Sequence, residues 1–287
     1  WGLAPVLGQS RPVPKGATVE LVDGGFEFTE GPIWYNEGLL FSDIPANTVY
    51  RWTPEDGTSV FLKPSGHANG LAIDPEGRLL LAQHDGQVGR HADEGTVRPL
   101  VSTYGGRRLN SPNDLTVASD GTIYFTDPPY GIAEEKRRLD FSGVYRLSTG
   151  GELTLLTKAF ARPNGICLSP NDSTLYVNDS RKTLIRAYDV TETGDLTNER
   201  MFATPQDEDA DGTTDGMKVD AEGNLYTTGP GGVWVYAPNG EKLARIPVPK
   251  APTNLAFGGK DGKTLFITAR PHVYRVPVNV PGVRSGR

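Results

Sequence analysis

Six copies of one short pattern run along this chain. Each copy begins with Asn, Asp or Glu, continues into an apolar run, turns at a tetrapeptide containing Gly or Asn, and returns as a second apolar run. The first residues are 39, 44, 51, 51 and 39 residues apart along the chain. We call these six the anchor residues: Glu30, Asn69, Asn113, Asn164, Asp215 and Asn254. A repeat of this length that holds four strands is typical of a β-propeller blade.

The rest of each repeat completes that pattern. A third alternating run follows the first two, as in NTVYRWTP, SGVYRLST and GVWVYAPN, and a fourth apolar stretch often comes next. The 35 Gly and 23 Pro residues supply the turns that so many short strands need. The sequence therefore predicts an all-β fold, a six-bladed β-propeller with four-stranded blades.

The two ends of the chain are expected to meet. The last repeat stops after PHVYRVPV, one strand short, and the N-terminal GATVELVD has the pattern of the missing outer strand. Closing the ring in this way removes exposed sheet edges. We expect a single domain over residues 1–287, with residues 1–16 as an N-terminal extension.

Charge and composition narrow the classes of partner. The net charge of −6 leaves no basic stripe, so we expect no nucleic-acid partner. No apolar run reaches the roughly 18 residues that a membrane helix needs, so we expect no membrane partner. The lone Cys167 excludes an internal disulfide framework. The chain starts at Trp1 rather than Met, so cytoplasmic and periplasmic locations both stay open, as does the oligomeric state.

The geometry of a blade predicts where the polar residues gather. The first strand of each repeat runs away from its anchor and the second strand returns, so the anchor and the second strand's end lie at one face. All six anchors should therefore surround one mouth of the central channel. The second-strand ends FSDI, AQHD, FTDP, VNDS and TTGP should lie around them.

This ring of anchors offers only oxygen and amide groups. Carboxylates and carboxamides suit a hard divalent cation, with Ca²⁺ as the first choice. An Asn at a strand start can instead simply close a turn through its own backbone. That alternative is weaker for Glu30, which has no such turn role, and for Asp215, where most repeats have Asn. Two acids at one channel mouth need a cation or a shared proton.

The same segments carry a family resemblance. EGPIW, NSPNDL, FTDPPYG, RPNGI and TDGMKVD, in this order on six repeats, resemble the gluconolactonase/SMP-30 (regucalcin) family of six-bladed propellers. The resemblance extends from about residue 18 to about residue 280, and NSPNDL with YFTDPPYG points to the bacterial gluconolactonase-like branch. It implies hydrolysis of a small-molecule sugar lactone with the help of one divalent cation, Ca²⁺ first, with Mg²⁺, Mn²⁺ or Zn²⁺ as alternatives.

The resemblance also implies roles for particular residues. The metal ligands fall on Glu30, Asn164 and Asp215, with Asn113 beside the metal and the substrate. Asp215 is expected to be the catalytic base as well. The family's animal branch has a substrate-binding arginine where this chain has Ser111, so Arg107 or Arg108, a few residues upstream, is a candidate replacement.

Two further residues at second-strand ends are candidates for substrate binding. His84, in AQHD, can hydrogen-bond sugar hydroxyls or move a proton, or can be an ordinary loop histidine. Tyr130, in DPPYG, can stack on a sugar ring, or the loop can be no more than a rigid turn.

A lactone is a cyclic ester, and its hydrolysis develops negative charge on the carbonyl oxygen. A bound cation can stabilise that charge, and a carboxylate beside it can take a proton from the attacking water, which typically contributes about 10²–10⁴-fold. Direct attack by Asp215 stays an alternative. So do a propeller hydrolase acting on organophosphates or other esters and lactones, and a non-catalytic binding propeller.

Overall fold

The computed structural model describes residues 11–92 and 95–283, and within these ranges the chain is built from strands. Its one helical segment there is a single 3₁₀ turn, η1 (Glu134–Lys136). The predicted all-β class is therefore confirmed. The part of the chain that the structure describes contains no helix long and apolar enough to cross a membrane.

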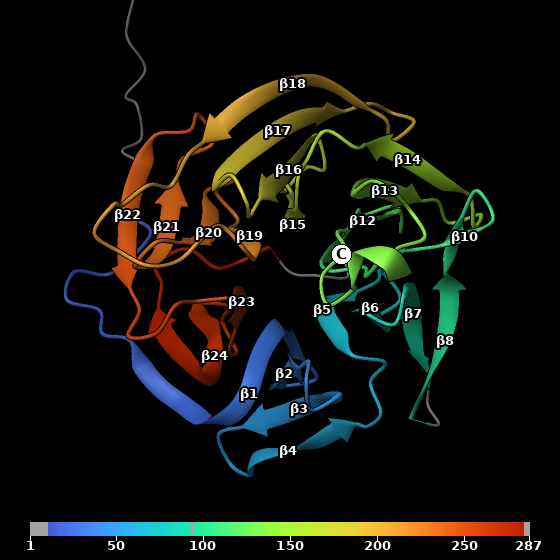
Figure 1. Cartoon of the computed structure of the whole chain (residues 1–287). Helices are drawn as coiled ribbons and strands as arrows, with labels where there is room; N and C mark the ends of the chain where they lie inside the picture. The colour runs from blue at the N-terminus through green and yellow to red at the C-terminus, as the bar shows by residue number, and fades with distance from the viewer. Residues whose placement is uncertain (1–10, 93–94, 284–287) are drawn as a thin grey trace, which may run out of the picture.

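The strands form a propeller-like ring of sheets around a central axis (Figure 1). Four sheets have four strands each, one sheet has six, and a separate ribbon has two. The six-stranded sheet has the order β23-β24-β1-β2-β3-β4, with β1 (Glu20–Tyr35), β2 (Gly38–Asp43), β3 (Thr48–Thr53), β4 (Gly57–Leu62), β23 (Asn254–Gly258) and β24 (Thr264–Pro277).

The other sheets each follow chain order. They are β5 (Ala68–Ile73) to β8 (Thr96–Val101), β11 (Leu115–Val117) to β14 (Leu153–Thr157), β15 (Pro163–Leu168) to β18 (Leu196–Ala203), and β19 (Met217–Val219) to β22 (Lys242–Pro247). Between their ends lie β6 (Leu79–Gln83), β7 (Gln87–Ala92), β12 (Ile123–Asp127), β13 (Gly143–Leu147), β16 (Thr174–Asp179), β17 (Leu184–Val190), β20 (Leu225–Gly229) and β21 (Gly232–Tyr236). The ribbon pairs β9 (Thr103–Tyr104) with β10 (Arg107–Arg108).

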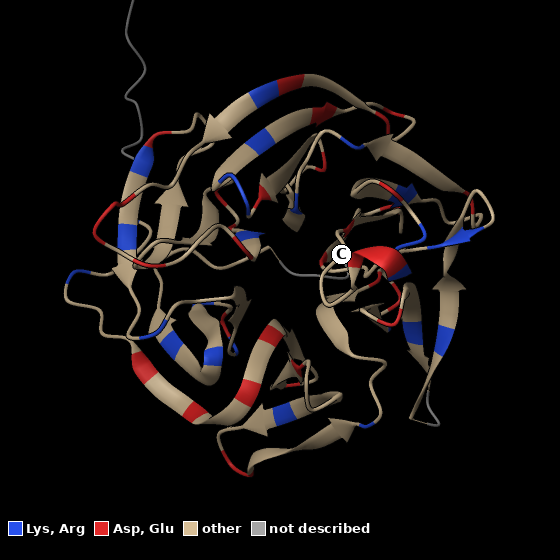
Figure 2. Cartoon of the chain, viewed as in Figure 1, with Lys and Arg blue, Asp and Glu red and all other residues tan. Residues whose placement is uncertain are grey.

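Burial changes from the axis to the rim of the ring. The second strands β2, β6, β12 and β20 are buried along their whole length, because neighbouring sheets cover both of their faces. The outer strands β4, β8 and β18 consist mostly of exposed and half-buried residues. Rigid inner strands thus surround the axis, where the anchors lie. Figure 2 shows acidic and basic positions interspersed around the ring, with acidic ones on the part of β1 near the centre.

The first and last repeats share the six-stranded sheet through two long strands. The second half of β1 pairs with β2, and its first half pairs with the end of β24, with Leu21 opposite Tyr274 and Gly24 opposite His272. The predicted N-terminal extension, residues 1–16, lies mostly outside the described residues.

Candidate active site

A cavity of about 620 Å³ opens at the mouth of the central channel. It brings together six of the seven predicted site residues from five different repeats: Glu30, His84, Asn113, Tyr130, Asn164 and Asp215. The anchor Asn69 also lines it. The anchor Asn254 lies against Glu30, and its Nδ2 donates to Oε2 of Glu30 at 2.9 Å.

The anchors sit at irregular points of the inner strands. The pairing register shifts just after Glu30, Asn69 and Asn164, between Glu30 and Ile33, Ala68 and Leu71, and Pro163 and Ile166. A β-bulge of this kind turns a side chain out of the regular alternation. The strands therefore aim the anchor side chains at the axis.

Glycines after the anchors let the inner strands approach each other closely. A Cβ on Gly31 would lie 1.8 Å from the carbonyl oxygen of Asn69, and one on Gly165 would lie 2.1 Å from that of Asp215. Only glycine fits at such distances. The Glu-Gly, Asn-Gly and Asp-Gly pairs of the sequence thus serve packing between repeats as well as turns.

Side chains from the second strands fix the same anchors. Ser42 donates to the carbonyl of Asn69 at 2.9 Å, and Thr126 donates to the carbonyl of Asn164 at 2.8 Å. Asn178 donates in the same way to the carbonyl of Asp215. Each of these bonds joins one repeat to the anchor of the next, so the ring itself sets the spacing of the site.

Aspartates at the second-strand ends hold the loops that lead into the anchors. The carboxylate of Asp43 accepts from the backbone N–H of Glu27 and Phe28, each at 3.0 Å. Asp127 accepts from the N–H of Asn110 at 2.9 Å, and Asp179 from that of Ala161 at 2.7 Å. The aspartates of FSD, FTD and VND, which were predicted to lie around the anchors, therefore hold the backbone in place through these hydrogen bonds.

The two acids of the site are held in conditions that disfavour their charged forms. Glu30 is 2% exposed, and burial raises its pKa to about 7 against the opposing hydrogen bonds from Gly31 and Asn254. Burial also raises the pKa of Asp215 well above its usual range, and the negative charges of Glu30 and Asp114 add to the rise. Oδ1 of Asp215 is buried and has no hydrogen-bond partner among the described residues.

Two charged residues near this pair were not foreseen from the sequence. Asp114 is 1% exposed, and Oδ2 of its carboxyl has no partner within the described ranges. Burial raises its pKa, and the charge of Lys218 opposes that rise. Lys218 also acts on Glu30. Once ionised, these three carboxyl groups outnumber the ammonium group and leave an excess of negative charge.

Tyr130 and His84 lie side by side on the cavity wall. Their rings are stacked, with centroids 6.5 Å apart. The Tyr130 hydroxyl accepts from Nδ2 of Asn164 at 3.2 Å and contacts Oγ of Ser180 at 2.5 Å. Burial, with a contribution from the charge of Asp215, raises the pKa of Tyr130 to about 12, so its hydroxyl keeps its proton.

His84 is neutral at pH 7, because burial lowers its pKa to about 4. Its Nε2 lies 3.1 Å from Nδ2 of Asn69. The carboxamide N–H₂ is a donor, so Nε2 is the acceptor and Nδ1 carries the ring proton. His84 can therefore offer a neutral N–H donor to a ligand.

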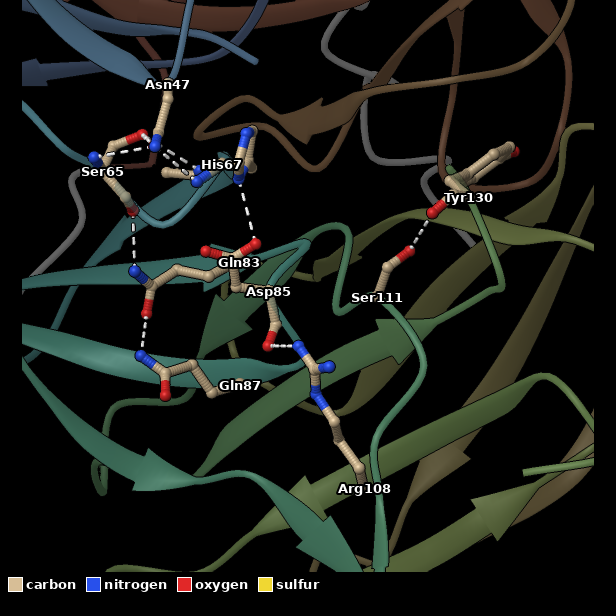
Figure 3. A network of polar contacts seen from close by, with 10 residues as sticks. Asn47, Ser65, His67, Gln83, Asp85, Gln87, Arg108, Ser111 and Tyr130 are labelled. Atoms are coloured by element: carbon tan, nitrogen blue, oxygen red, sulfur yellow. Dashed lines mark hydrogen bonds and ion pairs between the residues drawn. The ribbon is translucent and has the colours of Figure 1, made fainter. Parts of the chain in front are cut away.

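Arg108 is the predicted site residue that does not line the cavity. It lies on the ribbon strand β10, and its guanidinium donates to the carbonyl of Asp85 (Figure 3). Ser111 lies closer to the site and donates to the carbonyl of Tyr130 at 2.8 Å (Figure 3). Ser111, at the position where the resemblance led us to expect a substrate-binding arginine, thus fixes the Tyr130 loop through its hydroxyl.

The ligands available for a metal are oxygen atoms. Across residues 11–92 and 95–283, no three His, Cys, Asp or Glu side chains form a group that could hold a metal ion. A cation at this site would therefore need the carboxamides of Asn113 and Asn164 beside the two acids. Such a ligand set suits Ca²⁺ and other hard cations. The unpartnered Oδ1 of Asp215 and the excess negative charge fit a cation at this point.

Comparisons with known proteins agree with this geometry. The model of the family described as "SMP-30/Gluconolactonase/LRE-like region" matches residues 28–270. A gluconolactonase from Zymomonas mobilis is 37% identical, over 90% of this chain and 80% of the relative, and a pentonolactonase from Haloferax volcanii is 30% identical, over 86% and 83%.

Among solved structures, that of a gluconolactonase from Xanthomonas campestris is 32% identical and superposes with a TM-score of 0.86. The match covers 94% of this chain and 92% of that chain. With its ring of sheets, the cavity that its anchor residues line and the family match over most of its length, the chain belongs to the SMP-30/gluconolactonase family.

Proposed function

We propose that this protein is a lactonase that opens a sugar lactone of the gluconolactone type. The observation that carries the proposal is the convergence of the buried Glu30 and the half-buried Asp215, two acids from distant repeats, with the carboxamides of Asn113 and Asn164 on one cavity. A binding platform has no need to hold two acids in this costly environment. The lactonase names of the relatives support an enzyme of this class.

One divalent cation is part of the proposal. Glu30, Asn113, Asn164 and Asp215 would hold it, and their oxygen atoms favour Ca²⁺, with Mg²⁺, Mn²⁺ or Zn²⁺ as alternatives. When bound, the cation supplies Lewis-acid polarisation of the lactone carbonyl, worth several kcal/mol. The acids supply negative charge that the protein itself offsets only in part, through Lys218.

Asp215 is proposed to take the proton from the attacking water. A base works best when its pKa is higher than that of an ordinary carboxylate, and burial raises the pKa of Asp215 well above its usual range. The carboxylate oxygen of Asp215 that does not hold the cation would receive the proton. Attack by the Asp215 carboxylate on the carbonyl carbon is the alternative, and capture of an acyl-enzyme would distinguish the two.

The substrate is proposed to lie between the anchors and the Tyr130–His84 wall. Asn113 can donate to the ring hydroxyls beside the carbonyl, and the neutral His84 can donate through Nδ1. The hydroxyl of Tyr130 is bonded to Asn164, and the part of its ring that His84 and Arg162 leave uncovered would supply apolar contact to the sugar. Arg108 has no part in this arrangement, since its guanidinium is bonded to Asp85.

We also propose that the ring has six blades in one domain, residues 1–287, with the first and last blades joined in the six-stranded sheet. Six hydrophobic clusters among the described residues support this, each shared by consecutive repeats. One of them joins Leu39 and Phe41 of the first repeat to Phe266 and Val273 of the last. The pairing of Glu20 with Arg275 supports closure by the N-terminal strand.

Acid release from D-glucono-1,5-lactone, corrected for spontaneous hydrolysis, tests the function. We expect wild-type turnover with Ca²⁺, loss on chelation, and loss in Asp215→Asn. Asp209→Asn is the matched control, because Asp209 is an exposed acid nearby in the sequence that does not line the cavity. Absence of excess hydrolysis by wild type with Ca²⁺, Mg²⁺, Mn²⁺ and Zn²⁺ alike would rule out the gluconolactonase assignment.

A further inference from the structure

Two arginines line the same cavity as the acids. Arg162 lies in the loop that enters β15, and Arg181 lies just after β16. Both side chains are exposed, so they stand at the open part of the cavity rather than at its buried anchors. Neither was singled out by the repeat pattern.

The backbone beneath these arginines is fixed by one buried acid. Asp179 is 1% exposed, and its Oδ1 accepts from the backbone N–H of Arg162 at 3.3 Å and of Arg181 at 3.0 Å. The N–H of Ser180 donates in turn to the carbonyl of Arg162 at 3.0 Å. The two guanidinium groups therefore extend from adjacent, rigid positions on one wall.

Among the described residues, neither guanidinium group has an acidic partner. Within the described ranges, the ion pairs of Arg146, Arg186, Arg200 and Arg245 join them to acids on the protein surface, but none involves Arg162 or Arg181. The guanidinium carbon of Arg162 lies 5.4 Å from the centre of the Tyr130 ring. Stacking of this kind leaves the in-plane N–H donors of an arginine available.

Tyr130 lies between Arg162 and the proposed metal ligand Asn164. Its hydroxyl bonds to Asn164, while its ring contacts Arg162. The charges that act most strongly on Asp215 are Glu30 and Asp114, not the two arginines. The cavity thus has an acidic end that fits a cation and a basic end that has no partner.

A neutral sugar would leave two arginine forks without a charged partner, whereas a carboxylate, phosphate or sulfonate matches their geometry. We propose that the substrate is a sugar lactone with an anionic substituent away from the lactone carbonyl, and that Arg162 and Arg181 bind this substituent. The proposal rests on the proposed lactonase function and names its substrate class.

The test compares kcat/KM for three lactones: neutral D-glucono-1,5-lactone, its 6-phosphate, and a glucarolactone that carries a carboxylate. We expect wild type to prefer at least one anionic lactone by tenfold or more. Arg162→Gln and Arg181→Gln should each lower the ratio of anionic to neutral kcat/KM by about tenfold. Arg162→Lys should lose less, because it keeps the charge without the fork.

Arg98→Gln is the matched control, since Arg98 is an exposed arginine on the outer strand β8, away from the cavity. It should leave the ratio unchanged. Equal or better use of the neutral lactone by wild type, or a ratio that the cavity variants do not change, would overturn the proposal while the lactonase function stands.

If no lactone is hydrolysed, the proposed function fails. The anion site is then tested on its own, by measuring the affinities of 6-phosphogluconate and gluconate by calorimetry. Tighter binding of the phosphate that both cavity variants weaken would support the site. Equal binding of the two acids would overturn it.

Discussion

Nδ2 of Asn254 donates to Oε2 of Glu30 at 2.9 Å, although 224 residues separate the two in the chain. Asn254 begins the last repeat and Glu30 begins the first, and both lie in the six-stranded sheet, so this bond joins the two ends of the series of repeats. The candidate metal site therefore depends on the packing of the last repeat against the first.

Asn254→Leu should weaken both stability and cation binding. The change removes a donor to a buried carboxylate, which costs about 1–3 kcal/mol when the acceptor stays buried. Denaturant unfolding should show that loss, and Ca²⁺ titration should show weaker affinity. Unchanged Ca²⁺ affinity in a folded variant would contradict the role of Glu30 as a metal ligand.

Gly165→Ala should disturb the site through the backbone of the neighbouring repeat. The new Cβ would lie 2.1 Å from the carbonyl oxygen of Asp215, so one strand must move. Overpacking of this kind costs about 1–3 kcal/mol or more. The melting temperature in thermal unfolding and kcat should both fall.

Gly150→Ala is the control for that variant. The nearest atom to its added Cβ, Oγ of Ser148, is 3.7 Å away, in ordinary contact. Equal stability of the two variants would show that the inner strands tolerate the movement.

The stability of the protein should depend on pH through His84. Its pKa is about 4 in the folded protein and near 6.5 when unfolded, so the unfolded state binds the extra proton between these values. The free energy of unfolding should therefore fall as pH drops through 6.5 towards 4, by about 3 kcal/mol for this group. His84→Gln should show a shallower slope in urea unfolding between pH 7 and pH 4, and an identical slope would contradict the assignment.

The anchors were predictable because their spacing and the reversal of two strands place them at one face whatever the details of packing. The confirmed all-β class and the gathering of Glu30, Asn164 and Asp215 at one cavity follow from that pattern. The same reasoning predicted that His84 and Tyr130 lie at this face, because they end or follow second strands.

Other parts of the site depend on contacts that spacing does not show. Arg108 lies outside the cavity because Gly105 and Gly106, both with positive φ, turn the chain into the β9–β10 ribbon. Asp114 follows an anchor directly, and nothing in the repeat shows that its carboxyl is also buried beside the acids. The proximity of Arg162 and Arg181 depends on hydrogen bonds from their backbone N–H groups to the side chain of Asp179, which the repeat pattern does not show.

Tyr130→Phe tests whether Tyr130 positions a metal ligand. Its hydroxyl accepts from Nδ2 of Asn164, so its removal frees the carboxamide to turn, while the ring and its stacking stay in place. Loss of a group that orients a ligand typically lowers metal affinity by about 10–100-fold. We expect Ca²⁺ titration to show a loss in that range, and saturating Ca²⁺ to restore most of kcat. Ser180→Ala, which removes the other partner of the hydroxyl, should cost less because Asn164 keeps its bond. A Tyr130→Phe variant with wild-type Ca²⁺ affinity and raised KM would instead assign the hydroxyl to the substrate.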